Sequence, residues 1–211
     1  TWELIQELLM KCRGTLQIEY QGTKLDFSKY EMLDYTAKMN EFFGCDILEF
    51  NDVDVLRQKL VDAGMFPMAE LEDLKSIPTL VDYVYKRKIR GSIVNPTFLY
   101  NYPAYMMPLA RRNDEDECRI DMYQLLVCGS EICKGYSELV NPIQQMAAFE
   151  EQAKNIANGD EEAFNPDNDF VRAMEHGFPP ISGVGVGVDR LASIIFDQPT
   201  LRDIILFPIM K

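Results

Sequence analysis

The amino-acid sequence predicts an α+β fold in which a mainly antiparallel sheet is flanked by helices. Three observations lead to this prediction. Short runs of alternating apolar and polar residues lie on both sides of glycine-containing turns, a pattern typical of antiparallel strand pairs. Amphipathic segments that begin at capping residues and end at glycine indicate helices. The 211 residues contain no internal repeat and no low-complexity linker, so we expect a single domain over 1–211.

Residues 1–90 are predicted to form a hairpin and a helical region. Two alternating runs, 15–20 and 23–27, flank the turn dipeptide Gln21-Gly22, which predicts a β-hairpin. Apolar residues at helical spacing predict the helices, one of which would end at Gly44. The predicted helices cover residues 2–11, 32–43, 52–63 and 70–89, the last interrupted near Pro78.

Residues 91–211 have a different character, with strand candidates separated by prolines and glycines. Asn141 and Pro142 predict the start of a long helix, because asparagine caps helices and proline suits the first helical position; Gln144 completes a capping-box pattern. We predict strands over 92–100, 121–127, 131–139 and 183–188, helices over 142–158, 169–176 and 189–196, turns over 113–117 and 128–130, and an apolar run over 204–209.

The net charge is −13, and basic residues cluster only at 86–90 and at Arg111-Arg112. A protein that holds nucleic acid by neutralising phosphates usually has a basic surface, so the composition argues against an independent RNA-binding module. No apolar run reaches the roughly 18 residues of a membrane span, and no signal peptide opens the chain. We therefore expect a cytoplasmic protein with no membrane partner.

Five cysteines form no CxxC pair, and the sequence has a single histidine, His176. This composition argues against a zinc site and predicts buried free thiols in a reducing cytoplasm. His176 precedes a predicted helix stop at Gly177, so we interpret it as a capping or surface residue rather than a catalytic base.

The segment with the clearest chemistry is GVGVGVDRL, residues 183–191. Glycine at alternate positions leaves one face of a strand bare, so that a flat ligand can lie against the main chain. Arg190, at the start of the next helix, could cover the other face of that ligand and reach a phosphate with its guanidinium fork. The alternative is a tightly packed strand followed by an arginine without this role, because short glycine motifs are weak signals.

The surroundings of this segment closely resemble one family. Phe178-Pro179-Pro180 before it and LRDIILFP (201–208) after it resemble motif 3 and its flanks in class II aminoacyl-tRNA synthetases of the lysyl type. Upstream, EICKGYSEL (131–139) and Asn141-Pro142 resemble the amino-acid-binding strand of that family, and NPTF (95–98), PLA (108–110) and FEEQA (149–153) are similar as well. The resemblance is specific over 91–211 and fainter over 1–90.

This resemblance implies part of a catalytic core that makes lysyl-adenylate from lysine and ATP and then transfers lysine to tRNA(Lys). Arg190 would lie over the adenine and reach the γ-phosphate, and Gly185 and Gly187 would border the adenosine. Glu131 would hold a Mg²⁺ ion on the phosphates, because magnesium prefers hard oxygen ligands and shields charge while the α-phosphate is attacked.

The same resemblance implies that Tyr136 and Glu138 define the lysine side-chain pocket, where a carboxylate suits an ammonium group. The alternative for Glu138 is an ordinary solvated strand residue. Two departures from the family concern the metal-binding and lysine-binding positions; Met107 and Asn101 also differ from the family pattern. Gln124 stands where the family has a second metal-binding glutamate, which predicts weaker metal and ATP binding. Lys134 stands where the family has an asparagine in the lysine site, and a cation there is unfavourable unless it points elsewhere.

The sequence shows no segment resembling motif 1, which helps to build the family's homodimer interface, or motif 2, which holds the α-phosphate and adenine. The anticodon-binding barrel is not found either, so tRNA contacts would come from regions absent here. Two hypotheses remain. The chain is a segment of an active lysine–tRNA ligase, or it is a degenerate synthetase-like protein that acts as a non-catalytic binding or regulatory module. In either case we expect these residues alone to be inactive, because groups oriented around the reacting phosphate supply much of the catalysis.

Overall fold

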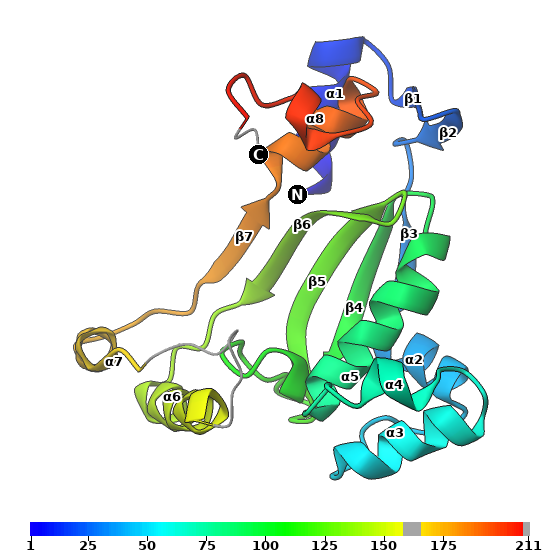
Figure 1. Cartoon of the computed structure of the whole chain (residues 1–211). Coiled ribbons are helices and arrows are strands. Elements are labelled where there is room, and N and C mark those ends of the chain that lie inside the picture. Colours follow the sequence, from blue (N-terminus) through cyan, green and yellow to red (C-terminus); the bar gives the residue numbers. More distant parts are fainter. Residues whose placement is uncertain (158–165, 209–211) are drawn as a thin grey trace. The chain divides into compact units, whose positions relative to one another are not determined.

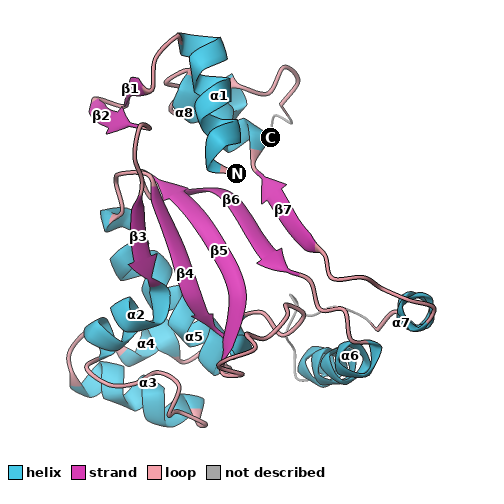
Figure 2. Cartoon of the chain, turned by 180° about the vertical axis from the view of Figure 1, so that it is seen from behind, coloured by secondary structure: helices cyan, strands magenta, loops and turns pink. Residues whose placement is uncertain are grey.

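The computed structural model describes residues 1–157 and 166–208 (Figure 1). It contains a five-stranded sheet in the order β3-β4-β5-β6-β7 and a separate two-stranded hairpin. The larger sheet is mostly antiparallel and flanked by helices (Figure 2), which confirms the predicted fold class. Its strands are β3 (Glu31–Asp34), β4 (Thr97–Pro103), β5 (Arg119–Val127), β6 (Ser130–Ser137) and β7 (Ser182–Val186).

The chain forms two compact units. Unit 1 comprises residues 1–100, 123–134 and 185–211, and unit 2 comprises residues 101–122 and 135–184. Strands β4 to β7 each contribute residues to both units.

Unit 1 begins with helix α1 (Trp2–Arg13) and the hairpin of β1 (Gln17–Tyr20) and β2 (Thr23–Asp26), which pairs antiparallel as predicted. Gln21 and Gly22 have φ of 48° and 76°, as a two-residue turn between twisted strands requires. Helix α8 (Val188–Ile195) lies beside α1 in both views (Figures 1 and 2). These elements, together with β5 and β6, enclose one hydrophobic core. Its buried side chains are Ile5, Leu9, Ile18, Leu25, Phe27, Leu125, Val127, Ile132, Cys133, Leu191, Ile194 and Ile195.

The rest of unit 1 is mainly helical, with α2 (Tyr35–Phe43), α3 (Val53–Asp62), α4 (Met68–Leu71), α5 (Ile77–Val84), a π-helical turn (Tyr85–Ile89) and a 3₁₀ turn (Arg90–Ser92). The helical region predicted over 70–89 is interrupted near Pro78 as predicted, since α4 ends at Leu71 and α5 begins at Ile77. Ser76 caps α5 by accepting the N–H of Thr79 at 3.3 Å. Pro78 lies in the first turn, where its missing N–H costs nothing, so the break falls before it.

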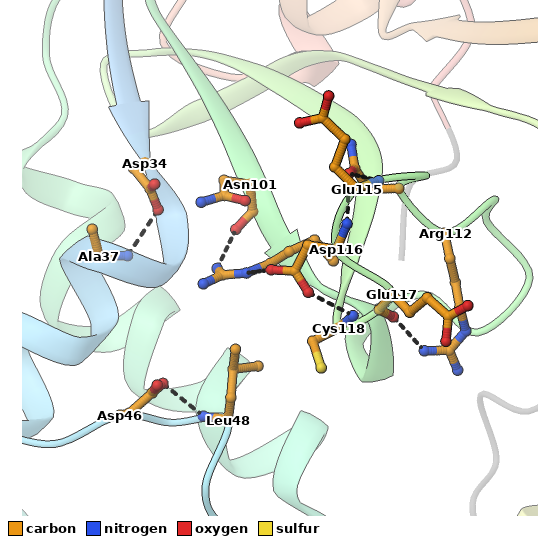
Figure 3. A network of polar contacts seen from close by, with 12 residues as sticks. Asp34, Ala37, Asp46, Leu48, Asn101, Arg112, Glu115, Asp116, Glu117 and Cys118 are labelled. Atoms are coloured by element: carbon orange, nitrogen blue, oxygen red, sulfur yellow. Dashed lines mark hydrogen bonds and ion pairs between the residues drawn. The ribbon is translucent and has the colours of Figure 1, made fainter.

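Residues 32–34, predicted as the start of a helix, instead belong to β3. This strand pairs in parallel with β4, from Glu31↔Thr97 to Asp34↔Tyr100. Asp34 then caps α2, since its Oδ1 accepts the N–H of Ala37 at 2.8 Å (Figure 3). The cap fixes the first helical residue at Tyr35.

The sequence predicted a strand that begins at residue 92, but β4 begins at Thr97. The carbonyl of Ile93 accepts the N–H of Gly129 at 2.8 Å, and the carbonyl of Val94 accepts the N–H of Cys128 at 2.9 Å. These bonds dock the turn that joins β5 to β6, which the sequence predicted over 128–130. The segment before β4 therefore anchors a turn instead of extending the strand.

Unit 2 contains α6 (Pro142–Ala157) and α7 (Asn168–Glu175). The predicted start of α6 is confirmed, because Asn141 Oδ1 accepts the N–H of Ile143 at 2.9 Å and that of Gln144 at 3.3 Å. The predicted end of this helix, at 158, lies outside the described residues. His176 is the exposed C-cap of α7, which confirms its interpretation as a capping residue.

The acidic turn over 113–117, also in unit 2, is exposed as predicted. Asn113 Oδ1 accepts the N–H groups of Glu115 and Asp116 at 2.9 and 3.0 Å. The carboxylate of Asp116 accepts from the N–H of Cys118 at 3.0 Å (Figure 3) and from Arg119 Nε at 3.3 Å. The turn is therefore closed by its own side chains.

Two further predictions need correction, on the end of β7 and on the cysteines. Strand β7 ends at Val186 instead of residue 188, because Gly187 is already the N-cap of α8. The apolar run, for which no element was predicted, has turn and irregular backbone over 204–208, and Ile209 lies outside the described residues. Of the five cysteines only Cys133 is buried, whereas Cys12 on α1 and Cys118 beside the acidic turn are exposed. Among the described residues, none of the helices is long and apolar enough to cross a membrane.

Candidate functional site

Arg190 and Glu131 meet in unit 1. Arg190 lies in the first turn of α8 and is exposed, and its Nη1 donates to the main-chain carbonyl of Glu131 on β6 at 3.1 Å. The N–H of Gly187 donates to the carbonyl of the next residue, Ile132, at 2.8 Å. Two hydrogen bonds therefore hold the start of α8, which carries Arg190, against β6, which carries Glu131.

The main chain of β7 has an uncovered side at Gly185. A Cβ added to Gly185 would come within 4 Å of one atom only, the carbonyl oxygen of Lys134 at 3.9 Å. A Cβ added to Gly187 would meet Ile132 O at 3.4 Å and the stem of Arg190 at 3.5 Å. Gly185 is exposed and Gly187 leaves room for the Arg190 stem, so this edge can receive a flat ligand beneath a guanidinium group.

Glu131 is half-buried, and its carboxylate takes part in none of the ion pairs seen among the described residues. Its negative charge acts on two buried neighbours. Burial is the main reason why the pKa of Tyr85 is raised, and Glu131 raises it further while Arg90 lowers it. Burial likewise raises the pKa of Cys133 to about 11, with a smaller raising effect from Glu131.

A magnesium site would have to be built from few protein ligands. Gln124, the other position implied by the resemblance, lies half-buried on β5 in the same unit as Glu131. The described residues contain no group of three or more His, Cys, Asp or Glu side chains able to hold a metal ion. One carboxylate and one amide oxygen fit a Mg²⁺ ion that arrives on phosphates and keeps several waters, not a closed protein cage.

The two residues assigned to the lysine pocket lie in unit 2. Tyr136 is half-buried on β6, and Glu138 follows the end of that strand. The N–H of Glu138 donates to the carbonyl of Ile181 at 3.0 Å, and Glu138 forms an isolated antiparallel bridge with Ala110. Its carboxylate takes part in none of the ion pairs seen among the described residues.

Lys134, the third residue assigned to that pocket, belongs to unit 1 and is half-buried on β6. The structure thus brings Arg190, Glu131, Gly185 and Gly187 together in one unit, and Tyr136 with Glu138 in the other. Sequence reasoning missed Gly183, whose importance depends on the position of the Glu138 side chain. The glycine repeat contained this residue, but spacing alone cannot distinguish it from Gly185.

The chain is similar in sequence to known proteins over its whole length. A profile of the family "tRNA synthetases class II (D, K and N)" matches residues 1–211. Lysine–tRNA ligases are similar over the whole chain or nearly so. Identity is 43% for the protein from Thermotoga maritima, with 100% of this chain and 41% of the relative covered. It is 39% for Aromatoleum aromaticum (99% and 41%) and 30% for Staphylococcus aureus (100% and 42%).

The chain thus spans about two fifths of the length of the curated relatives that it matches. The family match covers every residue, including the strand and helix that bear Glu131 and Arg190. This chain belongs to the class II tRNA synthetase family that comprises the D, K and N enzymes.

Proposed function

We propose that this chain is a lysine–tRNA ligase segment that contributes nucleotide-binding and lysine-binding residues to the activation of lysine by ATP. The observation that carries the proposal is the Arg190–Glu131 contact at 3.1 Å beside the uncovered glycine strand. Lysine and tRNA(Lys) would be the substrates of the whole enzyme, with tRNA contacts and dimerisation supplied by other segments. The names of the similar lysine–tRNA ligases support the substrate class.

The chemistry of Arg190 suits the binding of a nucleoside triphosphate. One of its N–H donors engages the Glu131 carbonyl, which fixes the direction of the guanidinium plane while other donors remain exposed. An adenine ring could stack between this plane and the main chain of the glycine strand. The remaining donors could then reach phosphate oxygens as charge-assisted hydrogen bonds.

Glu131 is proposed to hold the Mg²⁺ ion that accompanies ATP. Its carbonyl is occupied by Arg190, whereas its carboxylate forms none of the described ion pairs. The ion would neutralise phosphate charge when the lysine carboxylate attacks the α-phosphate and pyrophosphate leaves. Gln124 would add an amide oxygen, a weaker ligand than a carboxylate.

Glu138 is proposed to receive the ε-ammonium group of lysine, and Tyr136 to border the side chain. A half-buried carboxylate outside the described ion pairs attracts a cation more strongly than a solvated one does. Lys134 is a positive charge near that position in sequence and would reduce this preference. Together with Gln124, it favours the second candidate function, a synthetase-like module that binds without catalysing.

Calorimetric titration with ATP, with and without Mg²⁺, tests the nucleotide site. Arg190→Ala should lower ATP affinity at least tenfold in both conditions, whereas Arg202→Ala, an exposed arginine on the 3₁₀ turn Leu201–Asp203, should not change it. Glu131→Gln should lower affinity only when Mg²⁺ is present. Equal ATP binding by the parent and Arg190→Ala would contradict the proposed site.

A further inference from the structure

The carboxylate of Glu138 occupies the space where Gly183 has no side chain. A Cβ built on Gly183 would lie 2.3 Å from Glu138 Oε1 and 3.5 Å from Cδ. Both residues belong to unit 2, and the N–H of Glu138 is bonded to the carbonyl of Ile181, just before β7. The main chain of Glu138 is therefore anchored beside the strand across which its own carboxylate lies.

The need for glycine at this position is spatial. Gly183 is not among the residues with positive φ, so its backbone conformation is open to any residue. Among the described residues, the only atoms that a Cβ would meet within 4 Å are the oxygen and the carboxyl carbon of Glu138. Because these atoms form the end of a flexible side chain, a methyl group at 183 would displace the carboxylate without forcing the main chain to move.

The other glycines of the repeat have different neighbours. Gly185 faces the carbonyl oxygen of Lys134 at 3.9 Å, which is ordinary contact, and Gly187 faces Ile132 O and the Arg190 stem. Only Gly183 of the three is opposed by a carboxylate. A single strand thus combines glycines beside the proposed nucleotide site with one glycine matched to the proposed ammonium-binding carboxylate.

We propose that Gly183 is a positioning residue for Glu138 and thereby sets specificity for a primary ammonium on an unbranched side chain. This inference rests on the proposed role of Glu138 in lysine binding. With hydrogen at position 183, the carboxylate lies against β7. A methyl group there would displace the carboxylate away from β7, where it would meet the ammonium group of a shorter side chain instead.

A shorter acid should reverse the effect of the methyl group. Glu138→Asp withdraws the carboxylate by one methylene, so the pair Gly183→Ala with Glu138→Asp removes the overlap while it keeps the charge. Rescue of this kind would not follow if alanine at 183 merely disturbed β7. Gly185→Ala is the matched control, because it adds the same methyl group to the same strand opposite a main-chain oxygen.

The first measurement needs no ligand. The side-chain carboxyl ¹³C signal of Glu138, assigned by its loss in Glu138→Gln, should shift in Gly183→Ala and stay in place in Gly185→Ala. The melting temperature of Gly183→Ala should remain close to that of the parent. If Gly183→Ala fails to fold, the double variant Gly183→Ala with Glu138→Ala should fold normally, because the overlap is gone. An unmoved Glu138 signal, or a double variant as defective as Gly183→Ala, would overturn the proposal.

The second measurement is calorimetric titration with L-lysine and with ornithine in a Lys134→Asn background. Gly183→Ala should lower lysine affinity at least tenfold, leave ATP affinity unchanged, and regain lysine affinity when Glu138→Asp is added. Unchanged lysine affinity in Gly183→Ala would overturn the specificity role. A shifted Glu138 signal without lysine binding by any variant would confirm the positioning contact and contradict the proposed substrate instead.

Discussion

The carboxylate of Asp197 accepts two hydrogen bonds from Gln21, one from the main-chain N–H at 2.7 Å and one from the side-chain amide at 2.8 Å. Gln21 lies in the hairpin turn and Asp197 follows α8, and both have positive φ, 48° and 54°. Arg13 of α1 adds a hydrogen bond to the carbonyl of Ile195 at 3.0 Å. The C-terminal end of the helix that carries Arg190 is thus held by the first 21 residues, although that region carries no catalytic motif.

The hydrogen bonds between Gln21 and Asp197 predict that substitution of Asp197 destabilises the fold. Asp197→Gly removes both hydrogen bonds but keeps a residue that tolerates positive φ, so we expect a loss of about 1–2 kcal/mol in the free energy of unfolding. Asp197→Asn keeps an acceptor oxygen and should lose less than half as much. Urea unfolding followed by circular dichroism measures both. Equal stability of Asp197→Gly and the parent would show that these exposed bonds contribute nothing.

The 211 residues alone should show no lysine-dependent exchange of pyrophosphate into ATP above background. The reason is that no segment resembles motif 2, whose charged groups orient the α-phosphate in the family, and Arg190 cannot supply that geometry by itself. Exchange of labelled pyrophosphate by the purified chain is the measurement. Robust exchange that is abolished by Arg190→Ala would contradict this expectation.

Gln124→Glu should strengthen binding of ATP in the presence of Mg²⁺ by several-fold. A carboxylate is a better magnesium ligand than an amide and would add one negative charge to the proposed metal site. Without Mg²⁺ the same substitution should weaken ATP binding, because the added charge then repels the phosphates. Calorimetry at matched ionic strength separates the two conditions. A change of the same sign in both would place position 124 away from the metal.

The buried thiol of Cys133 predicts a loss of stability at alkaline pH. Its pKa is raised to about 11 in the folded chain by burial, compared with an ordinary value of 9.0. The folded state therefore holds the thiol proton more firmly than the unfolded state. This contribution to the free energy of unfolding is fully present below pH 9 and is lost as the pH rises through 11, by about 3 kcal/mol in total.

Cys133→Ala should flatten the decline of stability between pH 9 and 11, whereas Cys12→Ala, at an exposed position, should leave it unchanged. The free energy of unfolding measured by urea at each pH gives the comparison. At pH 8 a maleimide reagent should modify Cys12 and Cys118 before Cys133, because only Cys133 is buried. The same pH profile for the parent and Cys133→Ala would exclude this thiol as the cause.

Local patterns predicted the parts of the fold that local interactions determine. The hairpin around Gln21-Gly22 and the cap at Asn141 depend on residues next to one another in sequence, and both are confirmed. Strand β3 was missed because its partner is β4, distant in sequence, and its apolar residues also fit a helix. In the site, the bond from Arg190 to the main-chain carbonyl of Glu131 was not predicted, because it joins residues 59 apart in sequence. The constraint on Gly183 depends on where the Glu138 carboxylate lies, which spacing cannot show.

Lys134 is the residue most at odds with a lysine site, and we expect it to weaken lysine binding. A positive charge close to the substrate ammonium raises the free energy of the complex, most strongly where water is excluded. Lys134→Asn removes that charge and introduces the residue type that the resemblance implies at this position. The variant should therefore bind L-lysine measurably more tightly than the parent in calorimetric titrations, and the difference should shrink as salt concentration rises.

Lys86→Asn is the matched control for this prediction. It removes one positive charge from a surface residue whose Nζ pairs with Asp82, so net charge changes equally while the proposed pocket is untouched. If Lys134 were instead screened by water, its effect would be within about 0–1 kcal/mol, and lysine affinity would hardly change. Equal lysine binding by the parent, Lys134→Asn and Lys86→Asn would show that the charge of Lys134 does not affect lysine affinity. A gain confined to Lys134→Asn would identify this side chain as the charge that limits the site.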